Sequence, residues 1–91
     1  MRFRWTPAAA ADLLSISDYL QEHHQRYRDA TMRKLYGDIR ALKQWPGRGR
    51  PGREDGTREL LFRPAPCVAV YRVKHQTVEV MRIYHTAQDR P

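Results

Sequence analysis

The chain has 91 residues, and its 17 Lys and Arg outnumber its 10 Asp and Glu, which gives a net charge of +7 at pH 7. This length predicts a single domain spanning residues 1–91, and a hydrophobic share of 41% excludes wholesale disorder. The positive charge favours a polyanionic partner, either nucleic acid or an acidic protein, and no apolar run approaches the ~20 residues of a membrane span.

The N-terminal segment predicts a short strand followed by a helix. Apolar and basic side chains alternate along Met1–Trp5, which is the pattern of a half-buried strand. The same segment lacks the apolar stretch of a signal peptide, so we expect a cytoplasmic protein. Thr6 and Pro7 suit the N-cap and the first position of a helix, which should end near His23. Helical spacing places one apolar stripe at Ala9, Leu13, Ile16 and Leu20.

A second helix is predicted from about Arg28 to Gln44, with an apolar stripe at Met32, Leu35, Ile39 and Leu42. The connection between the two helices is short, which favours an antiparallel helix hairpin. Pro46 should end the second helix, because proline disfavours a helical residue before it. We expect Trp45 to pack in the core, and not to serve as a platform for stacked bases.

Residues 46–56 contain four glycines and two prolines, a composition that argues against any helix or strand. Arg48, Arg50 and Arg53 give this segment a strong positive charge. It is interpreted either as a solvated connector or as a mobile basic arm that touches phosphate.

The C-terminal part predicts three strands in quick succession, at Gly56–Phe62, Cys67–Val73 and Val78–His85. Both faces of the middle strand are largely apolar, so it should lie at the centre of the sheet with the helix hairpin on one side. Strict alternation in the last strand places Met81 and Ile83 on the face opposite to Val78, Val80, Arg82 and Tyr84. The predicted order is β-α-α-β-β-β, an α+β domain ending in a three-stranded antiparallel meander.

Several motifs, in this order and spacing, resemble the RelE/ParE superfamily, the toxins of bacterial type II toxin–antitoxin modules. They are Trp5-Thr6-Pro7-Ala8, Gly49-Arg50-Pro51-Gly52, Gly56-Thr57-Arg58-Glu59-Leu60, Val70-Tyr71-Arg72-Val73 and Val80-Met81-Arg82-Ile83-Tyr84-His85. The segment from Arg82 to the C-terminus is most similar to the ParE-like, or plasmid-stabilisation, branch.

This resemblance implies a toxin that inhibits growth by poisoning DNA gyrase and that is neutralised by an acidic antitoxin within a hetero-oligomer. It implies neither a cofactor nor a metal, and the sequence has no Cys/His cluster with metal-ligand spacing. Contacts to the antitoxin are expected at Arg2, Arg4, Arg26 and Arg33. Contacts to the target or to phosphate are expected at Arg48, Arg50, Arg53 and Arg63.

The resemblance leaves a second function open, because RelE-like members cleave mRNA on the ribosome. Such cleavage needs cations to stabilise the phosphorane and groups that carry protons. The chain offers Arg58 and Arg82 as cations, with Tyr84 and His85 as proton carriers. His85 matches a C-terminal catalytic histidine of the YoeB-like ribonucleases, but it also suits a structural role at the end of a strand.

The chain departs from the ribonucleases three residues before Tyr71, where those enzymes carry an essential arginine and this sequence has Val68. The loss of a phosphate-binding cation favours the ParE-like reading over the ribonuclease. A third interpretation is a basic nucleic-acid-binding domain with no toxic role.

Overall fold

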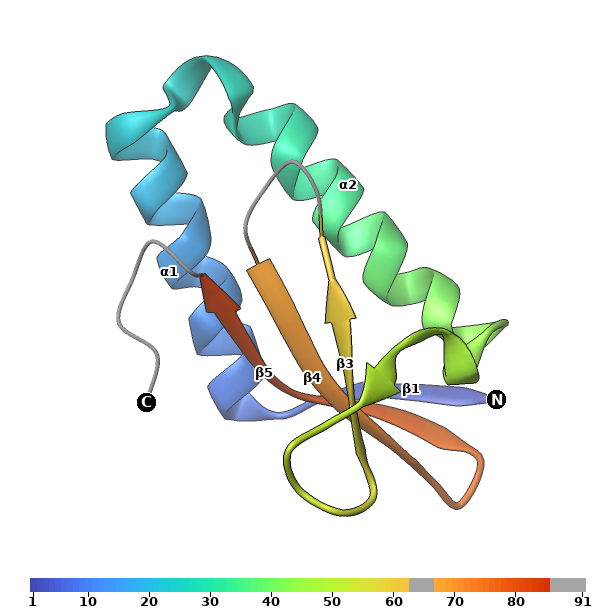
Figure 1. Ribbon diagram of the computed structural model, residues 1–91. Helices are drawn as coiled ribbons and strands as arrows, with labels where there is room; N and C mark the ends of the chain where they lie inside the picture. Colours follow the sequence, from blue (N-terminus) through green and yellow to red (C-terminus); the bar gives the residue numbers. More distant parts are fainter. Residues whose placement is uncertain (63–66, 86–91) are drawn as a thin grey trace.

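The computed structural model describes residues 1–62 and 67–85, and it consists of one sheet with two helices across one of its faces (Figure 1). The main elements are β1 (Arg2–Trp5), α1 (Pro7–His23), α2 (Arg28–Arg40), β2 (Arg50–Pro51), β3 (Thr57–Leu61), β4 (Cys67–Lys74) and β5 (Thr77–His85). The sheet order is β1-β5-β4-β3-β2. β1 runs parallel to β5, and the other neighbours are antiparallel. The predicted α+β fold with its antiparallel meander is confirmed.

The helix hairpin begins at a capped N-terminus and turns through a short 3-10 segment at Gln25–Tyr27. The Thr6 hydroxyl accepts a hydrogen bond from the backbone N–H of Ala9 at 3.1 Å and donates one to the carbonyl of Met81 at 2.8 Å. The N-cap therefore also attaches α1 to β5. α2 ends at Arg40 and tightens into a 3-10 turn at Ala41–Lys43, so the predicted helix to Gln44 is a helix with a 3-10 end.

The core lies between the two helices and the covered face of the sheet. Most of the two predicted helical stripes are buried there, since Ile16, Leu35, Ile39 and Leu42 are each at most 1% exposed. The sheet supplies Leu60, Cys67, Ala69, Tyr71, Val78, Val80 and Ile83. The predicted central position of β4 is confirmed by its place between β3 and β5.

A β-bulge in β5 changes which residues face the core. Val70 of β4 pairs with Arg82 and Tyr71 pairs with Val80, so Met81 is an extra residue between two paired positions. Val80 and Ile83, three residues apart, consequently both face the core. The prediction that Ile83 faces away from Val80 is wrong, because strict alternation holds only where no bulge interrupts the ladder.

Residues 46–56 are more ordered than their composition indicates. Pro46–Arg48 forms a 3-10 turn, and β2 pairs with β3 through Arg50 opposite Glu59 and Pro51 opposite Arg58. The prediction of neither helix nor strand here is wrong, because proline is tolerated on an edge strand, where one side of the backbone needs no partner.

Trp45, predicted to pack in the core, is 61% exposed. A continuing α-helix would have kept it on the stripe of Ile39 and Leu42. The helix has already tightened at Ala41–Lys43, and Trp45 itself has a non-helical backbone with φ −128° and ψ 70°. Its side chain therefore points away from the core.

Candidate functional site

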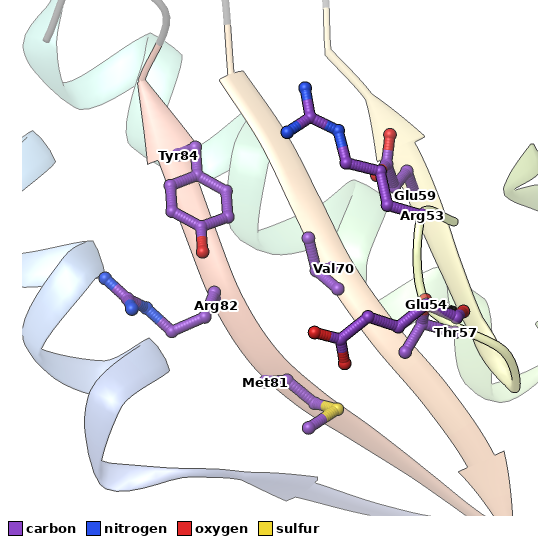
Figure 2. A pocket seen from close by; sticks show the side chains of 8 residues that line it. All are labelled: Arg53, Glu54, Thr57, Glu59, Val70, Met81, Arg82 and Tyr84. Atoms are coloured by element: carbon purple, nitrogen blue, oxygen red, sulfur yellow. Dashed lines mark hydrogen bonds between the residues drawn. The ribbon is translucent and has the colours of Figure 1, made fainter. Parts of the chain in front are cut away.

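The face of the sheet opposite the helices, here called the open face, carries a pocket of about 370 Å³ (Figure 2). Its floor follows the ladder of three strands, because Glu59 of β3 pairs with Val70 of β4, which pairs with Arg82 of β5. The full lining is Arg53, Glu54, Thr57, Glu59, Val70, Met81, Arg82 and Tyr84. The pocket thus combines two arginines, two carboxylates and apolar surface.

Arg82 is held in place by Asp12 of α1. Its Nε lies 2.7 Å from Asp12 Oδ2 and its Nη2 lies 3.1 Å from Oδ1, a bidentate pair. Asp12 Oδ2 also accepts the backbone N–H of Ile83 at 2.9 Å. The hydrogen bond with Asp12 raises the pKa of Arg82, and its Cζ lies 5.1 Å from the ring centroid of Tyr84. The guanidinium is therefore fixed and partly neutralised.

Other arginines of the open face also have acidic partners. Arg50 Nη2 lies 3.0 Å from Glu59 Oε1. Glu79 of β5 receives Arg72 at 2.7 Å and Arg4 at 3.1 Å. Both glutamates are only 8% exposed. The ion pairs that they form join neighbouring strands and compensate much of the positive charge of the open face.

The residues predicted for RNA cleavage lie on both faces of the sheet. Arg82 and Tyr84 line the open-face pocket. Arg58 pairs with core-facing Tyr71 and donates to the carbonyl of Gly49 at 2.8 Å. His85 is 5% exposed and lies against α1. The structure therefore brings Arg82 and Tyr84 together and leaves Arg58 and His85 on the other side.

His85 packs among aromatic rings at the end of β5. Its ring centroid lies 4.9 Å from that of Tyr19 of α1, and Tyr19 also contacts the rings of His23 and His24. Burial, and secondarily the nearby His24, lowers the pKa of His85 below its ordinary value of 6.5. The neutral imidazole therefore predominates at pH 7.

The arginines expected to contact an antitoxin are exposed and lie at two ends of the molecule. Arg2 and Arg4 are on the edge strand β1, while Arg26 and Arg33 lie on the helix hairpin (Figure 1). Of the residues expected to contact the target or phosphate, Arg53 lines the open-face pocket. The others are Arg48 in the 3-10 turn, Arg50 in β2 and Arg63, which lies outside the described residues.

Side chains from the sheet hold the turn at residues 46–49 in place. The buried Tyr71 hydroxyl donates to the carbonyl of Pro46 at 2.7 Å and accepts the backbone N–H of Gly49 at 2.8 Å. A Cβ added to Gly49 would lie 2.7 Å from that hydroxyl, so only glycine fits without displacement. Sequence reasoning missed this arrangement, although the choice of glycine before Arg50 was a signal of close backbone approach.

Sequence reasoning also missed Asp12, Glu59 and Glu79, the acids that pair with the arginines. In the sequence, Asp12 is one of several polar residues between Pro7 and His23, and nothing in its spacing identifies Arg82 as its partner. Among residues 1–62 and 67–85, no group of three or more His, Cys, Asp or Glu side chains is placed to hold a metal ion. Within the same ranges, no helix has the length and apolar character needed to cross a membrane.

The chain is similar to proteins of one known family. Residues 3–90 match the family described as "ParE toxin of type II toxin-antitoxin system, parDE". The chain is also 31% identical over 90 residues to "Putative toxin Y4kP" of Sinorhizobium fredii, an alignment that covers 99% of this chain and 93% of that protein.

Two solved structures extend the likeness to three dimensions. A structure of the chromosomal ParDE toxin–antitoxin system from P. aeruginosa superposes with a TM-score of 0.85 at 28% identity, covering 93% of this chain and 95% of the other. A chain of the toxin–antitoxin complex RelBE2 from Mycobacterium tuberculosis gives a TM-score of 0.59 at 28% identity, covering 96% of this chain and 92% of the other.

Proposed function

We propose that this chain, which belongs to the ParE toxin family of type II toxin–antitoxin systems, inhibits growth by binding DNA gyrase and is neutralised by an acidic antitoxin. It is a ParE-type toxin of the RelE/ParE superfamily. The proposal concerns the mode of action of this toxin: it inhibits growth by occupying a large target, and it does not cleave RNA.

The observation that carries the proposal is the division of the candidate catalytic residues between two faces. A metal-free RNA cleavage needs a base, a cation and an acid within reach of one phosphate. Arg82 and Tyr84 are available on the open face, whereas His85 is buried against α1 with its pKa lowered. Val68 is 1% exposed at the position where the ribonucleases carry an arginine, so this position supplies no cation.

The open-face pocket supports a protein target better than a reacting phosphate. Its lining alternates arginine with glutamate and adds apolar surface from Val70 and Met81. Such mixed lining is typical of protein interfaces, in which arginine and aromatic side chains provide anchors. Because Asp12 already fixes the Arg82 guanidinium, that side chain loses little entropy when a protein surface covers the pocket.

The antitoxin is proposed to cover the helix hairpin and the β1 edge. Leu14 of α1 and Tyr27 of the hairpin turn are 67% and 62% exposed, which supports docking of an apolar helix face. The exposed Arg26 and Arg33 lie on the same hairpin and would attract the acids of that segment. Arg2 and Arg4 would do the same at the sheet edge.

Induced expression in a bacterium tests the proposal. Wild type should arrest growth with the DNA-damage response that stalled gyrase produces, and co-expression of the neighbouring acidic antitoxin should restore growth. His85→Gln should leave the arrest intact, whereas Arg82→Ala should relieve it if the variant still folds. Arrest without DNA damage, but with cut messenger RNA, would indicate the ribonuclease instead.

A further inference from the structure

The turn that follows α2 presents an exposed tryptophan on a rigid frame. Trp45 is 61% exposed, and the backbone directly after it is held by Tyr71 at Pro46 and by Tyr71 and Arg58 at Gly49. The N–H of Arg48 also donates to the carbonyl of Trp45 at 3.2 Å, which closes the turn. The backbone that carries this side chain is therefore preorganised, so a ligand that stacks on the ring orders little further main chain.

Basic residues flank this tryptophan in the sequence. Lys43 precedes it and Arg48 follows it, both are exposed, and neither forms an ion pair with an acid among the described residues. Lys43 also lines a hollow of about 530 Å³. It is lined by Met1, Arg40, Ala41, Lys43 and Gln44, and so by no acid.

The paired arginines of the open face differ from the cations at this turn. On the open face, Arg50, Arg72 and Arg82 are each paired with a carboxylate. At the turn after α2, by contrast, Lys43 and Arg48 have no such partner among the described residues. A polyanion approaching the chain would therefore be drawn toward this surface more than toward the paired arginines.

We propose that Arg40, Lys43, Trp45 and Arg48, here called the tryptophan corner, bind single-stranded nucleic acid. A base stacks on the Trp45 ring while the flanking phosphates lie along the three cations, the combination that single-strand-binding surfaces use. A duplex offers no unstacked base to the ring. Arg40 ends α2, and its Cζ lies 5.7 Å from the ring centroid of Phe3 in β1, so the corner borders the surface proposed for the antitoxin. The binding test therefore uses the chain without an antitoxin.

The test measures binding of the purified full-length protein to fluorescently labelled oligo(dT) and oligo(rU) of roughly 12 nucleotides. Affinity should fall with salt, with a slope of log K against log salt near about −2 for three phosphate contacts on a single strand. Trp45→Ala should weaken binding by roughly 5- to 150-fold, and Trp45→Phe should retain most of the affinity. Saturating oligonucleotide should quench tryptophan fluorescence in wild type but not in Trp45→Phe.

A charge-matched pair of double variants provides the control. Lys43→Gln/Arg48→Gln should reduce the salt slope by about 1.4, while Arg26→Gln/Arg33→Gln removes the same charge from the hairpin and should change it far less. The proposal would be overturned if both double variants reduced the salt slope equally. It would also be overturned if Trp45→Ala bound the oligonucleotide as tightly as wild type while keeping an intact circular dichroism spectrum. So would tighter binding of duplex than of single strands, or displacement of the oligonucleotide by polyglutamate at equal charge, which would assign the corner to an acidic protein.

Discussion

Asp12 and Arg82, 70 positions apart in the sequence, form a bidentate ion pair that joins the first helix to the last strand. Asp12 also accepts the backbone N–H of Ile83, two residues after Met81, the extra residue of the β-bulge. One carboxylate thus positions a guanidinium on the open face and satisfies a backbone group where the ladder is irregular.

Replacing Asp12 by Ala should lower the free energy of unfolding by about 1–2 kcal/mol. Hydrogen bonds to a charged group typically contribute about 1.5–3 kcal/mol, and the 42% exposure of the Arg82 side chain reduces the share of the ion pair. Urea denaturation measures the change. Asp18→Ala, an exposed acid on the same helix, should remain within about 0.5 kcal/mol of wild type, and an equal effect of both variants would contradict the structural role of Asp12.

Gly49 and Gly47 offer a matched pair within one turn. Gly49→Ala places a Cβ 2.7 Å from the Tyr71 hydroxyl, and such overpacking typically destabilises by about 1–3 kcal/mol. Gly47→Ala meets nothing within 4 Å, so its effect should stay within about 0.5 kcal/mol. Thermal unfolding distinguishes the two. Equal stabilities would mean that Tyr71 does not hold the turn.

Stability should depend on pH through His85. Its folded pKa lies below the ordinary 6.5 because of burial and the nearby His24, so the unfolded chain takes up a proton first as the pH falls through about 6.5. The contribution of neutral His85 to the free energy of unfolding is complete above about pH 6.5. It is lost as the pH falls from about 6.5 toward the pKa of His85 in the folded protein. His85→Gln should flatten this part of the profile. A wild-type profile that loses no stability as the pH falls below about 6.5 would exclude the effect.

Cys67 should be inert in the folded protein. Burial raises the pKa of its thiol to about 11, and the residue is 1% exposed, whereas alkylation requires an accessible thiolate. Mass spectrometry after iodoacetamide treatment at about pH 8 should show an unmodified native chain and a singly modified chain in denaturant. Similar labelling rates in both states would contradict the buried position.

The order of elements could be predicted from the sequence, because helix stripes such as Ile16 and Leu20 and the alternation in β4 are local signals. The bulge at Met81 could not, since an unpaired residue is defined by the partner strand. The same holds for β2, whose two residues are a strand only because β3 lies beside them.

The candidate site was less predictable than the fold. The arginines were visible, but the acids that pair with them lie on other elements, as Asp12 of α1 does with Arg82 of β5. Which face of the sheet carries Arg58 or His85 depends on register and on the bulge, neither of which a single sequence displays. Trp45 lies outside the core because the end of α2 tightens from about 3.6 to about 3.0 residues per turn.

The central claim, that this toxin acts by occupying gyrase and not by cutting RNA, is tested most directly with one purified preparation in two assays. Gyrase supercoiling of relaxed plasmid is measured beside ribosome-dependent cleavage of messenger RNA, with wild type, His85→Gln and Arg82→Ala in each. The account predicts inhibited gyrase for wild type and His85→Gln, weaker inhibition for Arg82→Ala, and intact RNA throughout. Untouched gyrase together with RNA cutting that disappears in His85→Gln would contradict it.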